Sequence, residues 1–185
     1  LTLAGAGTVA FPNGTTWTEQ TSGASNFSQL SEVRYLNDTF VMVGRSGKIY
    51  TSPDGDGTNW TTQNSGGSTV NGVTYGNGTF VTAGRNGDIL TSTDGEEWIS
   101  QTSGTDDHLY GVTYGNGTFV TVGRGGTILT STDGTEGSWT MQTSETNQPL
   151  NEVTYGNGTF VVAGESGTIL TSTDLIEWIS RDSET

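Results

Sequence analysis

A segment of twelve residues recurs almost unchanged along this chain of 185 residues, and this repetition constrains the fold more than any other feature. The segment 70–81 returns nearly verbatim at 109–120 and again at 150–161. A looser copy begins at Leu30, and the second half of the unit occurs once more at the start of the chain. Aligned turn glycines are separated by 40, 40, 39 and 41 residues, at Gly7, Gly47, Gly87, Gly126 and Gly167. The chain is therefore an array of one unit of about 40 residues.

Each unit contains four short segments with strand character, bounded by turn residues. In the last unit these segments are 150–155, 160–164, 168–172 and the stretch around Trp178 and Ile179. The Asn-Gly pair between the first two segments favours a two-residue hairpin turn, because both turn residues need positive φ. Threonine supplies β-branching where a richer core would use valine, and no segment has helical periodicity.

A period near 40 with four strands per unit is typical of a β-propeller. Four full units give sixteen strands, and the leading fragment, which lacks the first strand of its unit, adds three. The sequence thus predicts one all-β domain over 1–185, a propeller of about five four-stranded blades with the first blade incomplete. The predicted divisions are 1–29 for the blade fragment and 30–69, 70–108, 109–149 and 150–185 for the repeats. The missing strand leaves three alternatives: a three-stranded blade, a piece of a longer array, or a neighbouring chain that completes the ring.

Composition narrows the classes of function. The chain carries 20 acidic and 6 basic side chains, with Lys48 as its one lysine, and a net charge of −14 would repel the phosphates of a nucleic acid. No run of 18 apolar residues is present, so no membrane insertion is expected. The absence of cysteine excludes disulfides and thiol chemistry. Few large aliphatic residues are needed here, because a repeat protein distributes its core between neighbouring units.

Four turns before the fourth strand carry Ser-x-Asp followed by Trp. They resemble the Asp-box, or BNR, repeat Ser-x-Asp-x-Gly-x-x-Trp, and the resemblance covers essentially the whole chain. The phrase GTILTSTDG is also similar to the repeat region of photosystem II assembly factors. The chain departs from the pattern in its Asp-to-Trp spacing, which is four or six instead of five, and in Leu175, which replaces Gly. The resemblance implies structural roles at the blade periphery for Asp54, Trp60, Asp94, Trp98, Asp133, Trp139, Asp174 and Trp178.

One face of the predicted propeller combines variable loops with a repeated arginine. The crossovers between blades differ from unit to unit, whereas the hairpin turns at the opposite face hardly vary. Arg45, Arg85 and Arg124 each follow the closing glycine of the second strand on the crossover face. Their guanidinium groups suit a carboxylate, sulfate or phosphate ligand at the channel mouth. The alternative interpretation is that each arginine pairs with an acid of a neighbouring crossover or stacks on a tyrosine.

Other candidate residues carry weaker signals. Asp106, Asp107 and His108 lie together in one crossover and are added to the predicted ligand site, although a solvated loop is the plainer interpretation. The segment 54–59 has some features of a calcium loop but lacks the terminal bidentate acid, so no metal or cofactor is predicted. The recurrent tyrosines of the first strand are expected in the core between blades: Tyr35, Tyr75, Tyr114 and Tyr155.

Enzymatic function is not predicted. Asp-box relatives include sialidases, but the chain has no Arg-Ile-Pro motif, and its few residues that break the repeat form no recognisable catalytic set. The sequence favours a non-catalytic binding module, lectin-like or adhesin-type, that recognises glycans or acidic ligands through the crossover face. A protein-interaction scaffold or assembly factor is the alternative, and a sialidase-like glycoside hydrolase is a remote one. The acidic composition with little lysine favours an extracellular or surface-exposed location.

Overall fold

The computed structural model describes residues 8–10, 16–18, 30–53, 55, 57–64, 66 and 68–181. Most of the leading fragment 1–29 lies outside the described residues, as do Asp54, Asp56 and the crossover 23–29. The predictions made for those residues therefore stay predictions.

Four antiparallel four-stranded sheets make up most of the described chain, and each sheet corresponds to one repeat. The first two consist of β3 (Leu30–Leu36), β4 (Thr39–Gly44), β5 (Lys48–Ser52) and β6 (Thr61–Asn64), and of β7 (Val70–Gly76), β8 (Thr79–Gly84), β9 (Ile89–Ser92) and β10 (Ile99–Gln101). The other two consist of β11 (Leu109–Gly115), β12 (Thr118–Gly123), β13 (Ile128–Ser131) and β14 (Thr140–Gln142), and of β15 (Leu150–Gly156), β16 (Thr159–Gly164), β17 (Ile169–Ser172) and β18 (Ile179–Arg181). The all-β propeller predicted from the repeat is confirmed, with four complete blades.

The leading fragment contributes one small sheet to the described chain. It pairs β1 (Thr8–Ala10) with β2 (Thr16–Thr18) in antiparallel register. The predicted fifth blade is thus represented by two strands among the described residues.

The hairpin between the first two strands of each blade has the predicted backbone. Asn77 and Gly78 both have positive φ, 48° and 79°, and Asn116 and Asn157 take nearly the same value at the equivalent turns. In the first blade the turn residues are Asn37 and Asp38, also at positive φ. The prediction of a two-residue turn with two left-handed residues is confirmed.

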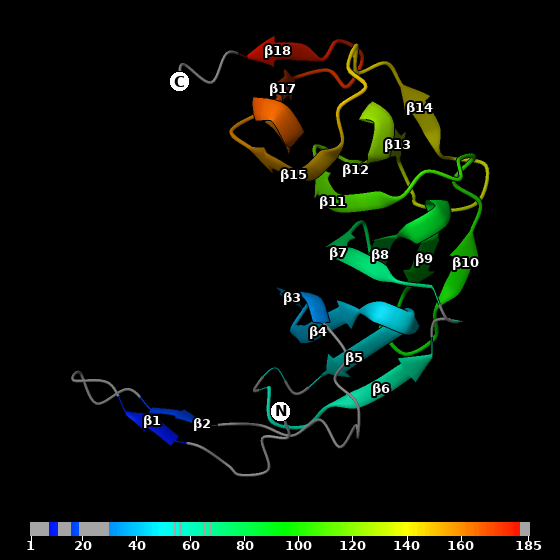
Figure 1. Ribbon diagram of the computed structural model, residues 1–185. Coiled ribbons are helices and arrows are strands. Elements are labelled where there is room, and N and C mark those ends of the chain that lie inside the picture. Colours follow the sequence, from blue (N-terminus) through cyan, green and yellow to red (C-terminus); the bar gives the residue numbers. More distant parts are fainter. Residues whose placement is uncertain are drawn as a thin grey trace.

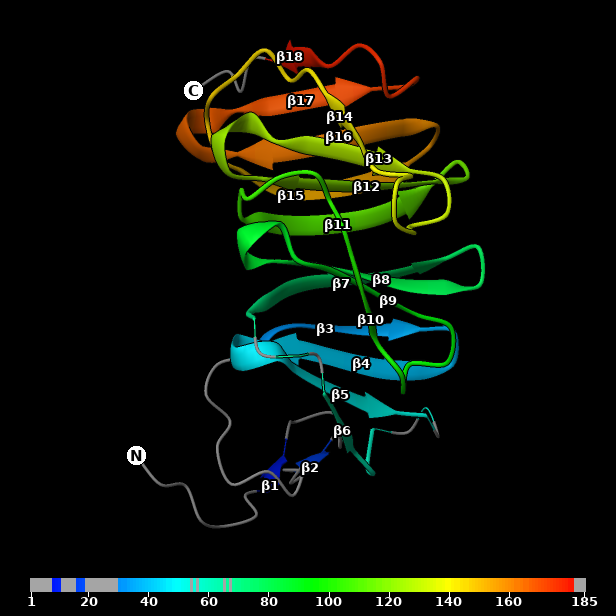
Figure 2. The ribbon, with the colours of Figure 1, turned by 90° about the vertical axis from the view of Figure 1, so that its right-hand side faces the viewer.

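The sheets stand one beside the next in an open arc, with the first strand of each blade innermost (Figure 1). The innermost strands β3, β7, β11 and β15 pack directly against one another, neighbour to neighbour. The first strand of each blade lines the inner side of the arc and the second strand lies next to it, because strand order within each sheet follows the chain. The single-turn helices lie along one side of the stack and the hairpin loops along the other (Figure 2).

The core lies between blades. Each sheet has a trailing face, which meets the following blade, and a leading face, which meets the preceding one. Val41, Val43 and Ile49 of the first trailing face form one buried cluster with Val70 and Val73 of the second leading face, together with Phe80 and Leu90. The same arrangement recurs at the next two junctions. Side chains alternate between the two faces along a strand, so a strand covered on both sides is apolar at successive positions.

The recurrent tyrosines of the first strands lie in the core between blades, with one exception. Tyr75, Tyr114 and Tyr155 are partly buried against the clusters between blades, as predicted. Tyr35 stands at the same position in the first blade, but it is 55% exposed. Among the described residues, no complete blade precedes the first sheet, and Tyr35 is correspondingly exposed.

Candidate functional site

The repeated arginines lie on four sharp turns that close the second strand of each blade. These turns are the 3₁₀ helices η1 (Arg45–Gly47), η2 (Arg85–Gly87), η3 (Arg124–Gly126) and η4 (Glu165–Gly167). The middle residue of each turn has positive φ, 57° at Ser46 and at Asn86, so the chain reverses within three residues. The first residue of each turn is exposed, and it is arginine in three blades and Glu165 in the fourth.

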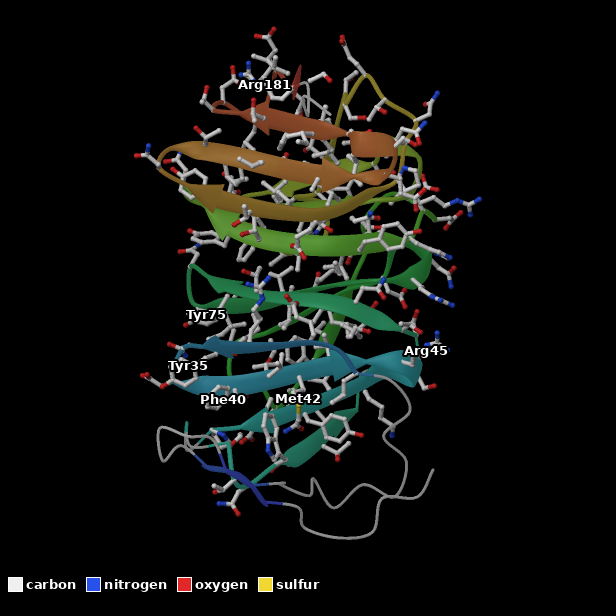
Figure 3. The ribbon with its side chains drawn as sticks, turned by 60° about the vertical axis from the view of Figure 1, so that its left-hand side comes forward. Tyr35, Phe40, Met42, Arg45, Tyr75 and Arg181 are labelled. Carbon is white, nitrogen blue, oxygen red and sulfur yellow. The ribbon has the colours of Figure 1, made fainter. Side chains whose placement is uncertain are left out.

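Hydrogen bonds fix the crossovers against these turns. The backbone N–H of Arg85 donates to the carbonyl of Thr69 at 2.9 Å, and that of Arg124 donates to the carbonyl of His108 at 2.8 Å. The N–H of Glu165 makes the equivalent bond to the carbonyl of Pro149. The turns and the variable crossovers therefore share one face of the molecule. In Figure 3 this face carries Arg45, at the opposite end of the blades from Tyr35 and Tyr75.

The three guanidinium groups of this face make no ion pair with a described residue. Within the described part of the chain the one ion pair joins Arg34 and Glu32, on the inner strand β3. Pairing of Arg45, Arg85 and Arg124 with described crossover acids, the alternative that the sequence also offered, is therefore not found. All three arginines are exposed, so their side chains are accessible to a ligand.

The crossover 104–108 takes part in the turn structure itself. The Asp107 carboxylate accepts a hydrogen bond from the Thr127 hydroxyl at 3.1 Å, and the N–H of Asn86 donates to Nδ1 of His108 at 3.0 Å. The imidazole also meets Tyr110 edge-on, with ring centroids 6.4 Å apart. Asp106 is exposed and lies beside them in sequence. Asp107 and His108 thus hold the crossover on η2 and η3, and their contact with a ligand stays a prediction.

A second concave region, which sequence reasoning did not identify, lies along the innermost strands. A pocket of about 290 Å³ is lined by residues from all four first strands, including Arg34, Thr74, Thr113 and Glu152. The Glu152 side chain is accessible to solvent, but partial desolvation of its carboxyl group raises its pKa, and the negative charge of Glu32 adds to the rise. One repeat position could have indicated this pocket in the sequence. It holds Glu32 in the first blade and Glu152 in the last, and glycine in the two blades between them.

The Ser-x-Asp turns at the periphery form local hydrogen-bond networks. The Asp94 carboxylate accepts the backbone N–H groups of Glu96 and Glu97 at 2.8 and 3.1 Å, and these bonds lower its pKa. Asp133 and Asp174 accept backbone N–H groups in the same way, with lowered pKa values. The indole N–H of Trp98 donates to the carbonyl of Gly95.

Among the other tryptophans of these turns, two follow the same pattern and one does not. Trp60 and Trp139 also donate to glycine carbonyls of their own turns. The buried Nε1 of Trp178 finds no acceptor among the described residues, in the turn where Leu175 replaces glycine. These four tryptophans, Trp60, Trp98, Trp139 and Trp178, precede the fourth strands of their blades instead of lying on them.

The described residues contain no group of three or more His, Cys, Asp or Glu side chains placed to hold a metal ion. The helices of this part of the chain are single turns, and none has the length and apolar character required to cross a membrane.

Four-stranded antiparallel sheets arranged around an inner channel define a β-propeller. The chain belongs to the family described as the DUF6242 beta propeller domain, whose model matches residues 11–145. A search of curated protein sequences found no match. The predicted resemblance to Asp-box repeats stays a prediction.

Solved structures similar to this chain include two of YCF48. A structure described as YCF48 bound to D1 peptide has a TM-score of 0.69 and 16% identity, over 87% of this chain and 55% of that chain. YCF48 from Cyanidioschyzon merolae has a TM-score of 0.67 and 17% identity, over 89% of this chain and 59% of that one. The WD40 beta propeller domain of Doa1 has a TM-score of 0.64 and 15% identity, over 90% and 59%. The chain thus spans little more than half the length of these proteins, and the likeness is one of fold.

Proposed function

We propose that this chain is a non-catalytic protein-interaction module that binds an acidic segment of a partner protein across the crossover face. The observation that carries the proposal is the row of three exposed arginines at equivalent positions, none of which is paired with an acid of the described chain. In a protein with 20 acidic and 6 basic side chains, three unpaired guanidinium groups on one face are a local exception to the surrounding charge.

The chemistry of the arginine favours carboxylates. A guanidinium group presents a planar fork of N–H donors that binds a carboxylate through two parallel hydrogen bonds. The turns that carry Arg85 and Arg124 are fixed by backbone hydrogen bonds to the crossovers, so their bases are held in place before a ligand arrives. Positions repeated from blade to blade match a ligand that is itself periodic, such as an extended peptide with acidic residues at intervals. The variable crossovers beside the arginines supply the surface that distinguishes one partner from another.

The comparisons support a protein or peptide as the partner. The similar YCF48 structure is described as bound to a D1 peptide, and Doa1 supplies a WD40 propeller. Their identity to this chain is 15–16%, so they indicate the class of partner and not its sequence.

The test uses fluorescence anisotropy with a labelled peptide of alternating Glu and Ser as the probe, and a Gln/Ser peptide as the uncharged control. Arg85→Ala and Arg124→Ala should each weaken binding by about tenfold, because a charge-assisted hydrogen bond contributes about 1.5 kcal/mol or more. Arg181→Ala is the matched control, since Arg181 lies on β18 and its Nε donates to Thr171. Equal affinity of all four proteins, or an equal loss in Arg181→Ala, would contradict the proposal.

Carboxylated glycans present the same charge and form the competing outcome. Binding of such glycans on an array, lost in the two arginine variants, with no binding of the acidic peptide, would replace the protein-interaction proposal by the lectin-like one. The extracellular or surface-exposed location is part of the same proposal, and labelling of intact cells with an antibody to the chain would test it.

A further inference from the structure

Among the described residues, no blade covers the trailing face of the last blade, whereas every other trailing face is covered by the blade that follows it. Val41, Val81 and Val120 occupy equivalent positions in the first three blades and are fully buried. Their equivalent in the last blade, Val161, is 37% exposed, and Ala163 beside it on β16 is exposed as well. The last blade therefore presents an apolar surface of the kind that binds another blade at three places in this chain.

The leading face of the first blade has the complementary deficit. Val33 is 57% exposed, whereas Val73, Val112 and Val153 at the same position are at most 3% exposed. Leu30 is 42% exposed, although Leu109 and Leu150 are fully buried at equivalent positions. Figure 3 shows Tyr35, Phe40 and Met42 at this end of the stack and Arg181 at the other.

Gly156 at the end of β15 identifies what the trailing face is shaped to receive. A Cβ at Gly115, its equivalent in the third blade, would overlap the ring of Tyr155 from the next blade, and a Cβ at Gly76 would overlap Tyr114 in the same way. A Cβ at Gly156 would meet nothing within 4 Å. Gly156 has no positive φ that would require glycine, so the position is open for a tyrosine ring from a following blade.

One polar bond across an internal junction has an equivalent donor on the last blade. Asn71 donates to the carbonyl of Leu109 at 2.6 Å, and Asn151 stands at the equivalent position of the last blade. The group that would accept its hydrogen bond in a following blade is the carbonyl of residue 30. Glu152 does not repeat the bond that Glu32 makes to the N–H of Val73, because its carboxylate accepts the N–H of Val153 in its own blade.

A pocket on the trailing face marks a third point of fit. At the junction of the second and third blades, a Cβ at Gly134 would lie 3.6 Å from Cγ2 of Thr91, so the turn of the later blade rests on the earlier strand. Thr171, the equivalent of Thr91, lines an open pocket of about 210 Å³ in the last blade. Gly55 is the turn glycine of the first blade that corresponds to Gly134.

We propose that the trailing face of the last blade binds the leading face of the first blade of a second copy of this chain, and that two copies close head to tail into one ring. The apolar positions, the tyrosine opposite a glycine and the asparagine bond all match the internal junctions. The four complete sheets of two copies supply eight blades, at the upper end of the usual range for a closed propeller, and the small β1–β2 sheet is not counted among them. A head-to-tail interface forms a finite ring only when its rotation closes, and the open arc of Figure 1 has the curvature of a part of such a ring.

The test compares masses in solution by size-exclusion chromatography with light scattering at micromolar concentrations. The unmodified chain should have twice the 19.4 kDa of one copy. Val161→Glu and Val33→Lys should each give single copies, because a charge would be buried in the interface. Both side chains are exposed in one copy, so the fold should persist, and far-ultraviolet circular dichroism checks this. Met141→Glu is the matched control. Met141 is 57% exposed on β14 of the third blade, which belongs to neither of the two faces proposed to pair, so its substitution should leave the dimer intact.

An equimolar mixture of Val33→Lys and Val161→Glu tests the head-to-tail arrangement more directly. Head-to-tail pairing places the lysine opposite the glutamate at one interface and leaves the other interface unmodified, so the mixture should recover the double mass. A single-copy mass for the unmodified chain would overturn the proposal. So would a dimer that Val33→Lys dissociates and Val161→Glu does not, because that result identifies pairing of two leading faces. Open assemblies larger than two copies would overturn closure of the ring.

Discussion

Gly115 and Gly156 occupy the same position in successive repeats but have different surroundings, and this difference predicts opposite effects of one substitution. In Gly115→Ala the new methyl group overlaps the ring of Tyr155, which belongs to the next blade. Neither glycine has positive φ, so alanine introduces no backbone strain at either site. The effect therefore measures only the packing between blades.

The structure sets the magnitude. Overpacking a core position costs about 1–3 kcal/mol. Displacing Tyr155 also disturbs its contact with Phe160, whose ring centroid is 4.6 Å away, at about 0.5–1.5 kcal/mol. Gly115→Ala should thus lower the free energy of unfolding by about 2–4 kcal/mol, which corresponds to a fall in Tm of roughly 5–15 °C for a chain of this length. The lower end applies if the ring can shift. At the first junction Leu36 stands at the glycine position, and it and Tyr75 are both partly buried against the same cluster.

Gly156→Ala is the matched control. Its methyl group enters open space and restricts only the unfolded chain, which should raise stability by about 0.4–1 kcal/mol. Both substitutions are measured by thermal and urea unfolding in the Val161→Glu background, so that association of copies does not contribute. In the double variant Gly115→Ala/Tyr155→Ala the overlap is absent, and its stability should be no lower than that of Tyr155→Ala alone. Equal effects of the two glycine substitutions, or additive effects in the double variant, would refute the assigned packing.

Three further predictions concern protonation and the peripheral turns. Desolvation raises the pKa of Glu152 above 4.5, so the ionised carboxylate disfavours the folded state and stability falls as pH rises through the raised pKa. Glu152→Gln should therefore be more stable than the unmodified chain at pH 7. In urea unfolding near pH 4 this gain should be absent. Backbone N–H donors lower the pKa of Asp94 from 3.8, so the stabilisation of the fold by its carboxylate is complete above that pH and is lost as the pH falls below it. In Asp94→Asn the midpoint of urea unfolding should therefore decline less steeply below about pH 4. Trp98→Phe removes a hydrogen bond to Gly95 and should cost about 0.5–1.5 kcal/mol from that bond, whereas Trp178→Phe removes an indole N–H with no acceptor among the described residues and should lower Tm less.

Much of the fold could be predicted from residues close together in sequence. The Asn-Gly hairpins and the four strands per repeat appear in the structure within a residue or two of their expected bounds. The alternation of Phe80 and Val81 between two buried faces follows from the two-residue period of a strand. These features depend on local backbone preferences and on side-chain order, both of which each repeat carries in full.

The candidate site could be predicted only in part. The position of Arg85 and Arg124 beside the crossovers was evident from the strand order of a blade, but their lack of ionic partners was not. The inner pocket was missed because Arg34 and Glu152 are separated by most of the chain and meet only when the first strands pack side by side. No local pattern records that residues of the first and last blades line one pocket.

The sequence by itself determined the repeat, the strands and turns within it, and the apolar positions available for packing, because these depend on interactions within about 40 residues. Only the tertiary structure decided which of those positions are filled. Val33 and Val73 occupy the same position of the repeat, yet one is 57% exposed and the other 1%, because burial depends on whether a blade packs on the leading side. Equivalent positions of the repeat thus acquire different surroundings from their places in the arc.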